Sequence, residues 1–403
     1  MLPNYPELEK KRIIIGVTGG ISLYKTCILL RAIKKAGAEV RVVMTRNATR
    51  FVSPQTFQTL SGNPVYTELF PAHFLQEPLH IRLSEWGEVI LLAPATANII
   101  GKMASGIADD LLSTLLTAFP GPVLIAPAMN DVMWHNPAVK ENIGKISRRG
   151  TEIIPPGKGE LASGKIGEGR MAEVEKIIFH LRKIFSSQDL KGKKVIVTAG
   201  PTREYIDDIR FISNPSSGKM GYHLSEEAAL RGAEVLLLSG PVNLPAPEGV
   251  KKIEIESVEE LKENIEKHFP ACDILIMSAA VGDFRVKEKF PGKLKRKDAL
   301  SLRLVPTPDI LKGIGERKKN QIVVGFSAET ENLRERSKNK LKEKKADLVI
   351  GCLIKEKVSG FNLEKIEGWL IGKDGREEKF PLVEKRVLAK MVIEEVKKIG
   401  GWK

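Results

Sequence analysis

The chain has 403 residues, enough for two to three domains at the usual size of roughly 100–200 residues each. It carries 64 lysines and arginines against 50 aspartates and glutamates, a net charge of +14, and 42% of its residues are hydrophobic. That apolar share is typical of globular proteins and excludes a disordered or collagen-like chain. The three cysteines, Cys27, Cys272 and Cys352, form no CxxC pair, and the six histidines show no HExxH spacing. We therefore expect neither a disulfide framework nor a thiolate or histidine metal site.

The amino-terminal residues are polar and contain no apolar stretch of the kind that a secretory signal requires. The longest apolar region runs from Val89 through residues 111–129, and prolines and two aspartates interrupt it. Because no run of about 18 uncharged apolar residues exists, we expect no transmembrane helix. The composition predicts a cytoplasmic protein with no membrane partner and with an excess of positive charge.

Two segments far apart in the chain resemble each other. KRIIIGVTGGIS (Lys11–Ser22) and KKVIVTAGPTRE (Lys193–Glu204) are each a β-branched run that ends in small residues, as a buried parallel strand and its tight turn do. Each is followed by a second match, AGAEVRVVMT (Ala36–Thr45) and RGAEVLLLSG (Arg231–Gly240). This repeated strand–turn–helix–strand pattern predicts two α/β domains, each a doubly wound, Rossmann-like parallel sheet.

The predicted boundary lies in the polar stretch Ser186–Lys193, which gives domains of residues 1–188 and 189–403. Residues 1–190 carry 22 basic and 17 acidic groups, and residues 191–403 carry 42 and 33, so the larger surplus lies in the second half. Further strands are expected at residues 88–93, 122–126, 273–279, 321–326 and 347–350, helices at 258–269, 334–345 and 384–399, and a hairpin at 369–380.

Thr18, Gly19, Gly20 and Ser22 lie between the first predicted strand and the helix after it. Backbone N–H groups at such a helix start face an anion, most often a phosphate, although a plain tight turn is an equally good interpretation. Thr45 ends the next strand, and open α/β sheets bind ligands at the carboxyl ends of their strands. The pattern is not GxGxxG, so this loop alone does not identify a ligand.

Three further segments are more specific. They are LHIRLSEWGEVILLAPATAN with His80, PAMNDVMW with Met129 and Asn130, and LASGKIGEGRMAE with Ser163 and Arg170. Together with the first glycine loop they resemble the flavin-dependent cysteine decarboxylases. The resemblance extends over almost the whole chain to the bifunctional coenzyme A biosynthesis family, in which a phosphopantothenoylcysteine decarboxylase is fused to a phosphopantothenate–cysteine ligase.

The resemblance implies that bound FMN oxidises the cysteinyl thiol of 4′-phosphopantothenoylcysteine, so that the carboxylate leaves as CO2 and the ene-thiol is then reduced. His80 matches the catalytic histidine, and an imidazole titrates near neutrality. Asn130 matches the residue that holds the substrate carboxylate, beside Met129, and Arg170 is expected to close over the substrate. The residues expected to hold FMN are Thr18, Gly19, Gly20, Ser22, Thr45, Ala93, Thr96 and Asn98.

Ser163 departs from the family pattern, because related decarboxylases have a cysteine there that protonates the ene-thiol. A thiol titrates at about 8.5, whereas an alkyl hydroxyl is a far weaker acid. Three explanations stay open: an engineered cysteine-to-serine change, a lineage that uses another proton donor, or a decarboxylase that stops at the ene-thiol. Cys27 lies inside the first predicted helix and is no obvious substitute.

The second half contains polar loops that suit a nucleotide. Residues Thr198–Gly221 end in SNPSSGKMG, an anion-binding loop before a helix or else a turn-rich surface loop, and not a Walker motif. Asp283 follows a predicted strand, where a carboxylate suits sugar hydroxyls or a metal-bound water. Lys340 and Lys344 share one helical face and suit a triphosphate, although such a basic helix is more often a solvated surface.

These segments resemble the ligase half of the same family, which implies that CTP activates the carboxylate of 4′-phosphopantothenate as an acyl-cytidylate before the amine of L-cysteine attacks it. By resemblance, Asn214 orients the carboxylate and Lys293 serves the attack step. Mg²⁺ is expected to arrive with CTP. The expected substrate loop comprises Ser216, Ser217, Gly218 and Lys219. The expected nucleotide site comprises Ala279, Asp283, Lys293, Thr307, Pro308, Asp309, Ile310, Phe326, Lys340 and Lys344.

The nearest alternative is a normal ligase with a stalled decarboxylase half. Alternatives from another class are a flavoprotein regulatory subunit and a basic nucleic-acid-binding protein. The last is disfavoured because only 6% of the residues are aromatic and no RNA- or DNA-binding motif is present. The resemblance also implies a homo-oligomer. Decarboxylase trimers and ligase dimers on one chain generate a dodecamer.

Overall fold

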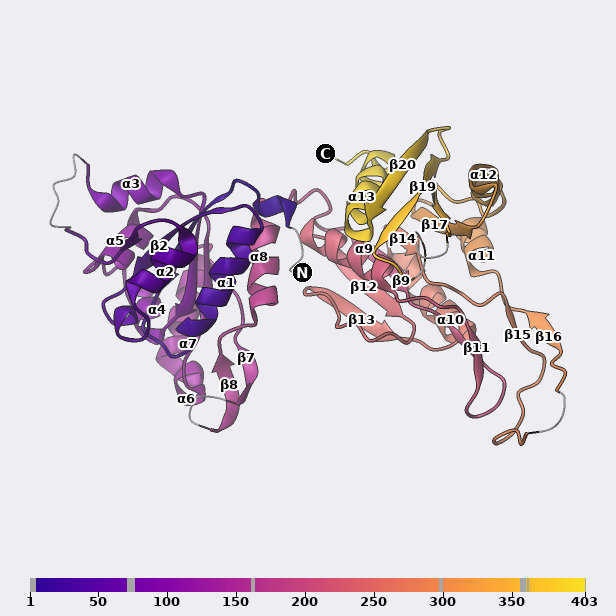
Figure 1. The fold of residues 1–403 in the computed structure, drawn as a ribbon, viewed down its shortest axis with the longest axis horizontal. Coiled ribbons are helices and arrows are strands. Elements are labelled where there is room, and N and C mark those ends of the chain that lie inside the picture. Colours follow the sequence, from indigo (N-terminus) through magenta and orange to yellow (C-terminus); the bar gives the residue numbers. More distant parts are fainter. Residues whose placement is uncertain are drawn as a thin grey trace. The chain divides into compact units, whose positions relative to one another are not determined.

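The computed structural model describes residues 5–70, 77–160, 164–296, 300–355, 360 and 362–402. Its contacts divide the chain into two compact units, residues 1–186 and 187–403 (Figure 1). Each unit is an α/β layer structure built on one large sheet, as the sequence predicts. Short 3-10 turns lie at Pro6–Leu8, Ala48–Arg50 and Phe269–Ala271.

The first unit is built on a six-stranded parallel sheet in the order β3-β2-β1-β4-β5-β6. Its strands are β1 (Arg12–Val17), β2 (Glu39–Met44), β3 (Val65–Tyr66), β4 (Val89–Ala95), β5 (Val123–Pro127) and β6 (Glu152–Ile153). The helices are α1 (Leu23–Lys35), α2 (Pro54–Ser61), α3 (Leu79–Trp86), α4 (Ala97–Ser105), α5 (Leu111–Ala118), α6 (Asp131–His135), α7 (Pro137–Arg148) and α8 (Val174–Phe185). A separate antiparallel ribbon joins β7 (Gly157–Glu160) to β8 (Ile166–Arg170).

Both faces of this sheet are covered, which is why β1 is apolar along its length. Ile13 and Ile15 pack in one core with residues of α1, α2 and α8. Ile14 points to the opposite face and packs with residues of α3, α4, α5 and α7. The unbroken RIIIGV run therefore reflects a central strand that is buried on both sides.

The second unit has an eight-stranded sheet in the order β13-β12-β9-β14-β17-β18-β19-β20. These strands are β9 (Lys194–Ala199), β12 (Glu234–Ser239), β13 (Val250–Glu254), β14 (Ile274–Met277), β17 (Ile322–Glu329), β18 (Leu348–Leu353), β19 (Lys365–Gly372) and β20 (Glu377–Glu384). The helices are α9 (Lys219–Leu230), α10 (Val258–His268), α11 (Ile310–Arg317), α12 (Leu333–Glu343) and α13 (Lys385–Gly400). Two small ribbons pair β10 (Arg203–Tyr205) with β11 (Phe211–Ser213), and β15 (Phe284–Val286) with β16 (Leu304–Pro306).

The hairpin predicted at residues 369–380 is present as β19 and β20, and it adds two strands to the edge of the second sheet. Because β19 runs antiparallel to its neighbours, this sheet is mixed, unlike the fully parallel first sheet. The helix predicted at residues 384–399 is α13, and it packs against α9.

The predicted repeat reappears as one arrangement in both sheets. β1 lies between β2 and β4, and β9 lies between β12 and β14, so each is the strand at which the order of the sheet reverses. Thr18, after β1, donates a 2.7 Å hydrogen bond to the Pro94 carbonyl and accepts one of 3.1 Å from the Thr96 N–H. In the second unit the Thr198 hydroxyl accepts from the Ala279 N–H at 3.0 Å. One threonine in each unit therefore ties the two diverging strand ends together.

Candidate active sites

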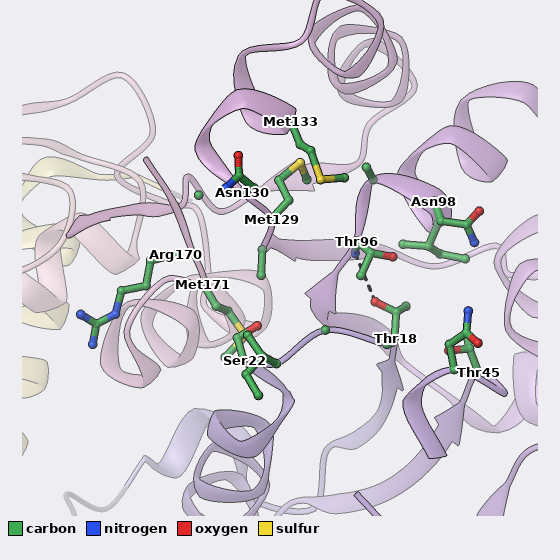
Figure 2. Close-up of a pocket in the computed structure, with 18 of the residues that line it drawn as sticks. Thr18, Ser22, Thr45, Thr96, Asn98, Met129, Asn130, Met133, Arg170 and Met171 are labelled. Carbon is green, nitrogen blue, oxygen red and sulfur yellow. Dashed lines mark hydrogen bonds between the residues drawn. The ribbon is translucent and has the colours of Figure 1, made fainter. Parts of the chain in front are cut away.

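A cavity of about 1120 Å³ opens at the carboxyl ends of β1, β2, β4 and β5, where the strand order reverses (Figure 2). This is the place where doubly wound sheets bind ligands. The cavity gathers most of the residues expected to hold a flavin and its substrate. They are Thr18, Gly19, Gly20, Ser22, Thr45, Thr96, Asn98, Met129, Asn130 and Arg170.

One end of this cavity has the features of a phosphate cradle. A Cβ atom added at Gly19 would lie only 2.7 Å from the Cβ of Asn47, so the backbone there approaches its neighbour more closely than a side chain permits. Ser22 immediately precedes α1, and its Oγ is buried with no hydrogen-bond partner among the described residues. Because buried hydroxyls are normally hydrogen-bonded, this one marks a ligand position. A phosphate at a helix start fits it.

Asn130 and Met129 line the cavity beyond β5. The Oδ1 of Asn130 accepts a hydrogen bond from the Val132 N–H at 2.9 Å, so its Nδ2 amide is the donor that remains for a ligand. The Met129 N–H donates to the carbonyl of Gly169 at 2.9 Å, which ties this loop to β8. A Cβ at Gly169 would lie 2.2 Å from the Met129 carbonyl oxygen, and its φ of +130° also requires glycine.

Arg170 follows on β8 and also lines the cavity. Its guanidinium lies 3.3 Å from Glu173, which also pairs with the buried Lys25 at 3.2 Å. In Figure 2 the guanidinium points away from Thr18 and Thr96. Arg170 therefore lies at the edge of the cavity, and its guanidinium does not extend across it.

Ala93 does not line this cavity, contrary to the sequence interpretation. It is fully buried in β4 within the core formed with α1, and its carbonyl accepts the Thr26 hydroxyl at 2.8 Å. Strand alternation turns its side chain into that core, and Thr96, beyond the strand end, takes the position at the cavity.

His80 lies on α3, half-buried, and is absent from the cavity lining, whereas Ser163 lies outside the described residues. The lining also includes charged residues that sequence reasoning missed, among them Lys25 and Lys102. Lys102 binds Asp109 at 2.5 Å and Asp110 at 2.8 Å. Nothing in the local sequence pattern indicated either lysine.

A second cavity, of about 740 Å³, opens at the carboxyl ends of β14, β17 and β18. It brings together segments that lie more than 100 residues apart in the chain. The predicted residues that line it are Asn214, Ser216, Gly218, Lys219, Ala279, Asp283, Thr307, Pro308, Asp309, Ile310, Phe326, Lys340 and Lys344.

Asn214 fastens the SNPSSG loop to the end of β14. Its Nδ2 donates to the carbonyls of Ala280 and Val281, at 3.2 and 3.0 Å. Both N–H groups are therefore engaged with the protein, and Oδ1 is the atom that remains for a ligand. The sequence interpretation expected the amide to meet a carboxylate, but in this arrangement it offers an acceptor, which suits an amine or a hydroxyl.

Lys340 and Lys344 make one side of this cavity positive. Lys344 forms an ion pair with Asp309, which also caps α11 through the Lys312 N–H at 3.0 Å. Burial lowers the pKa of Lys340, and the neighbouring charge of Lys344 lowers it further, against the opposing effect of Glu329. The ammonium groups of Lys340 and Lys344 repel each other, and the nearby carboxylate offsets this repulsion only in part. An anion bound between them stabilises both charges.

Ser217 does not line the second cavity, although Ser216 and Gly218 do, and Lys293 is also absent from the lining. Lys293 is exposed in the segment between β15 and β16. Asp207, fully buried, accepts the N–H of Leu294 at 3.1 Å, and Arg210 donates to the Leu294 carbonyl at 2.7 Å. Both backbone groups next to Lys293 are thus held by the turn between β10 and β11.

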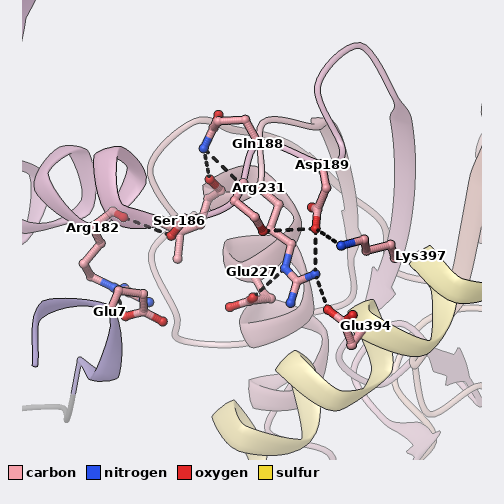
Figure 3. A network of polar contacts seen from close by, with 11 residues as sticks. Glu7, Arg182, Ser186, Gln188, Asp189, Glu227, Arg231, Glu394 and Lys397 are labelled. Carbon is pink, nitrogen blue, oxygen red and sulfur yellow. Dashed lines mark hydrogen bonds and ion pairs between the residues drawn. The ribbon is translucent and has the colours of Figure 1, made fainter. Parts of the chain in front are cut away.

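A third polar cluster lies outside both cavities (Figure 3). Arg231 binds Glu227 at 3.0 Å, Glu394 at 2.9 Å and Asp189 at 3.3 Å, and Lys397 lies 3.1 Å from Asp189. The cluster fastens the start of the second unit to α9 and α13.

The end of the first unit is held separately. Arg182 of α8 donates to Glu7 at 3.0 Å and stacks on the ring of Tyr5. The cluster in each unit is a structural anchor, and neither lines a cavity.

Within the described residues, no group of three or more histidine, cysteine, aspartate or glutamate side chains is arranged to hold a metal ion. The same residues include no helix long and apolar enough to cross a membrane.

Comparisons with known proteins match a different family to each of the two compact units. Residues 1–186 match the family described as Flavoprotein, and residues 190–399 match the DNA/pantothenate metabolism flavoprotein C-terminal domain. The coenzyme A biosynthesis bifunctional protein CoaBC of Bacillus subtilis is 43% identical over 394 residues, which cover 96% of this chain and 97% of that protein. Its counterpart from Vibrio vulnificus is 40% identical over 398 residues, 98% of this chain and 99% of that protein.

Among solved structures, the C-terminal domain of a CoaBC protein is 36% identical and covers 53% of this chain and 98% of that domain, with a TM-score of 0.46. The two α/β units, each with a cavity at the carboxyl ends of parallel strands, define a two-unit protein of the flavoprotein class. With near full-length identity of about 40%, the chain belongs to the family of coenzyme A biosynthesis bifunctional proteins.

We predict that Thr18→Val lowers both the stability of the first unit and its retention of flavin. Valine keeps the shape but leaves the Thr96 N–H and the Pro94 carbonyl without their partner, at a cost of about 1–3 kcal/mol. Urea denaturation and flavin absorbance after desalting measure the two effects. Thr59→Val, on the exposed face of α2, is the matched control, and equal behaviour of the two variants would contradict the assignment.

We predict that Arg231→Met destabilises the second unit by about 3–5 kcal/mol, because the buried carboxylate of Glu227 loses Arg231 and that of Asp189 keeps Lys397 alone of the two cations described beside it. The surface pair of Lys262 and Glu259 provides the control, since Lys262→Met should cost less than about 1 kcal/mol. The denaturation midpoint, followed by tryptophan fluorescence, reports both. A loss at Arg231 no larger than that at Lys262 refutes the anchoring role.

Proposed function

We propose that the chain catalyses two consecutive steps. Residues 187–403 join 4′-phosphopantothenate to L-cysteine with CTP, through an acyl-cytidylate, and residues 1–186 decarboxylate the resulting 4′-phosphopantothenoylcysteine with FMN to give 4′-phosphopantetheine. The family makes the chain a bifunctional enzyme of coenzyme A biosynthesis, with a decarboxylase half and a ligase half. Beyond the family, we propose that the flavin is FMN, that the nucleotide is CTP with Mg²⁺, and that the residues have the roles given below.

The unpartnered Ser22 hydroxyl at the start of α1 is the observation that carries the decarboxylase assignment. With Gly19, Gly20 and Thr18 it fits the phosphate of FMN, and the cavity extends from there to Asn130. When bound, the flavin supplies the two-electron oxidation of the substrate thiol that lets the carboxylate leave as CO2. The Nδ2 of Asn130 binds that carboxylate without adding a charge that would stabilise it against leaving.

The ligase assignment is supported by the positive side of the second cavity. Lys340 and Lys344 lie where the triphosphate of CTP supplies the missing negative charge, and fixed charges of this kind stabilise a pyrophosphate that leaves. Asp283, Phe326 and the Thr307–Ile310 segment contact the nucleoside. Mg²⁺ arrives with the triphosphate, whose oxygens are the ligands that it prefers.

In the second ligase step, the amine of cysteine attacks the activated carbonyl and CMP leaves. The Oδ1 of Asn214 is placed to accept a hydrogen bond from that amine. We assign to Lys293 the neutralisation of developing charge in this step. Asp207 and Arg210 then act as positioning residues, because they hold the backbone beside it.

We also propose a homo-oligomer in which decarboxylase units form trimers, ligase units form dimers, and both contacts together give a dodecamer. A site completed at a subunit interface accounts for the position of His80 outside the lining of its own cavity. The mass of the intact chain by light scattering tests this, and a monomer would contradict it. Cytoplasmic location is proposed because the three cysteines are free thiols.

We predict that the protein decarboxylates 4′-phosphopantothenoylcysteine but reduces the ene-thiol poorly, because the Ser163 hydroxyl is a much weaker acid than a thiol. Incubation with 4′-phosphopantothenate, L-cysteine and CTP, followed by product masses, tests both halves together. The ene-thiol is lighter than 4′-phosphopantetheine by two hydrogen atoms. Ser163→Cys should restore the saturated product, and full conversion by the unmodified chain would sink the prediction.

We predict that Asn214→Asp abolishes amide formation and leaves the flavin absorbance unchanged. Aspartate lacks both N–H groups, so its carboxylate would face the carbonyls of Ala280 and Val281. Asn264→Asp is the matched control, since its Nδ2 also donates to a backbone carbonyl, on α10 and away from the cavity. Pyrophosphate release and product mass are measured, and normal ligation by Asn214→Asp refutes its role.

A further inference from the structure

Four lysines line the second cavity, and they come from two sides of the unit. Lys340 and Lys344 belong to α12 and its end, whereas Lys219 and Lys385 are the first residues of α9 and α13. In Figure 1, strands β17 and β19 lie between α12 and the packed pair α9 and α13. The cavity therefore has a second group of cations, of which sequence reasoning identified Lys219 and missed Lys385.

Lys385 is held firmly at this cavity. Only 3% of the residue is exposed, and its N–H donates to the Glu364 carbonyl at 2.9 Å. The next residue, Arg386, binds Glu226 of α9 at 3.3 Å, which fastens the start of α13 to α9. A buried ammonium group is costly unless anions surround it.

Glu364 is the acidic residue that acts on Lys385 and on Lys219. Glu364 is the near acid, but its side chain is largely exposed and forms an ion pair with Lys219. Burial lowers the pKa of Lys385 to about 8, and the opposing effects of Cys352 and Glu364 do not restore it. Lys219 and Lys385 therefore place two positive charges near the Glu364 carboxylate, and both residues line the cavity.

We propose that Lys385 and Lys219 form a phosphoryl-binding subsite of the second cavity, distinct from the subsite of Lys340 and Lys344. This rests on the proposed function, in which two phosphate-bearing molecules occupy the cavity together. Two groups of cations on two sides match two anionic groups, one the triphosphate of the nucleotide and the other the phosphate monoester of 4′-phosphopantothenate. The shared chemistry is a phosphoryl group, and the experiment decides which molecule carries it.

The test compares Lys385→Met, Lys385→Arg and the control Lys379→Met, an exposed lysine of β20 that does not line the cavity. For each variant the KM for CTP, the KM for 4′-phosphopantothenate and kcat are measured by pyrophosphate release. Loss of a charged hydrogen bond predicts that Lys385→Met raises one of the two KM values roughly tenfold or more. Lys385→Arg and Lys379→Met should stay within about threefold of the unmodified protein.

The KM value that changes identifies which molecule carries the phosphoryl group. A raised KM for CTP alone assigns the subsite to the triphosphate. A raised KM for 4′-phosphopantothenate, with reduced preference over unphosphorylated pantothenate, assigns it to the monoester. If both KM values are unchanged in a folded Lys385→Met variant, the proposal is overturned. If circular dichroism shows that this variant is unfolded, Lys219→Met, whose side chain is partly exposed, gives the same readout. Turnover by the unmodified chain tests the proposed function separately.

Discussion

Both cavities depend on one constraint: two adjacent strands must separate at their carboxyl ends without exposing unpaired backbone groups. At the switch point the loops leave the sheet in opposite directions, and a crevice opens between them. A buried threonine resolves this in each unit, since Thr18 bridges to the groups around Pro94 and Thr96, and Thr198 accepts from Ala279. The hydroxyl replaces the ladder hydrogen bonds that end there. In each unit the two diverging strand ends are thereby held together, and the loops that follow them differ between the units.

Part of the surplus of positive charge lies at the second cavity. Four of its lining residues are lysines, and two of these are placed where burial lowers the pKa of the side chain. Such positions weaken the folded protein slightly in the absence of ligand and are stabilised when an anion binds. Other basic residues are paired at the surface, as Arg334 is with Glu377, and such exposed pairs contribute little to stability.

The sequence was sufficient for the repeat, the two sheets and most of both cavities, because strand ends and glycine turns are local features. The interpretation of the sequence failed for residues whose position depends on packing between distant parts of the chain. Ala93 lies three positions before Thr96, the first residue of this segment to line the cavity, and the pleat of β4 turns its side chain into the core. His80 and Lys293 are not among the residues that line the two cavities. The sequence pattern indicates only that Lys385 lies at the start of an amphipathic helix. The packing of α13 on α9 brings it near Lys219, which is 166 positions earlier in the chain.

The two units also show how one scaffold serves two reactions. In the first, α1 follows Ser22 directly, so the helix start and its hydroxyl face the cavity. In the second, residues 200–218 intervene between β9 and α9 and include the β10–β11 ribbon. That insertion carries Asn214, which offers an acceptor where Asn130 offers a donor. A site that must release a carboxylate needs a neutral donor to hold it, and a site that must guide an incoming amine needs an acceptor. The two asparagines therefore differ in which end of the amide the backbone leaves unoccupied, and the roles proposed for them depend on that difference.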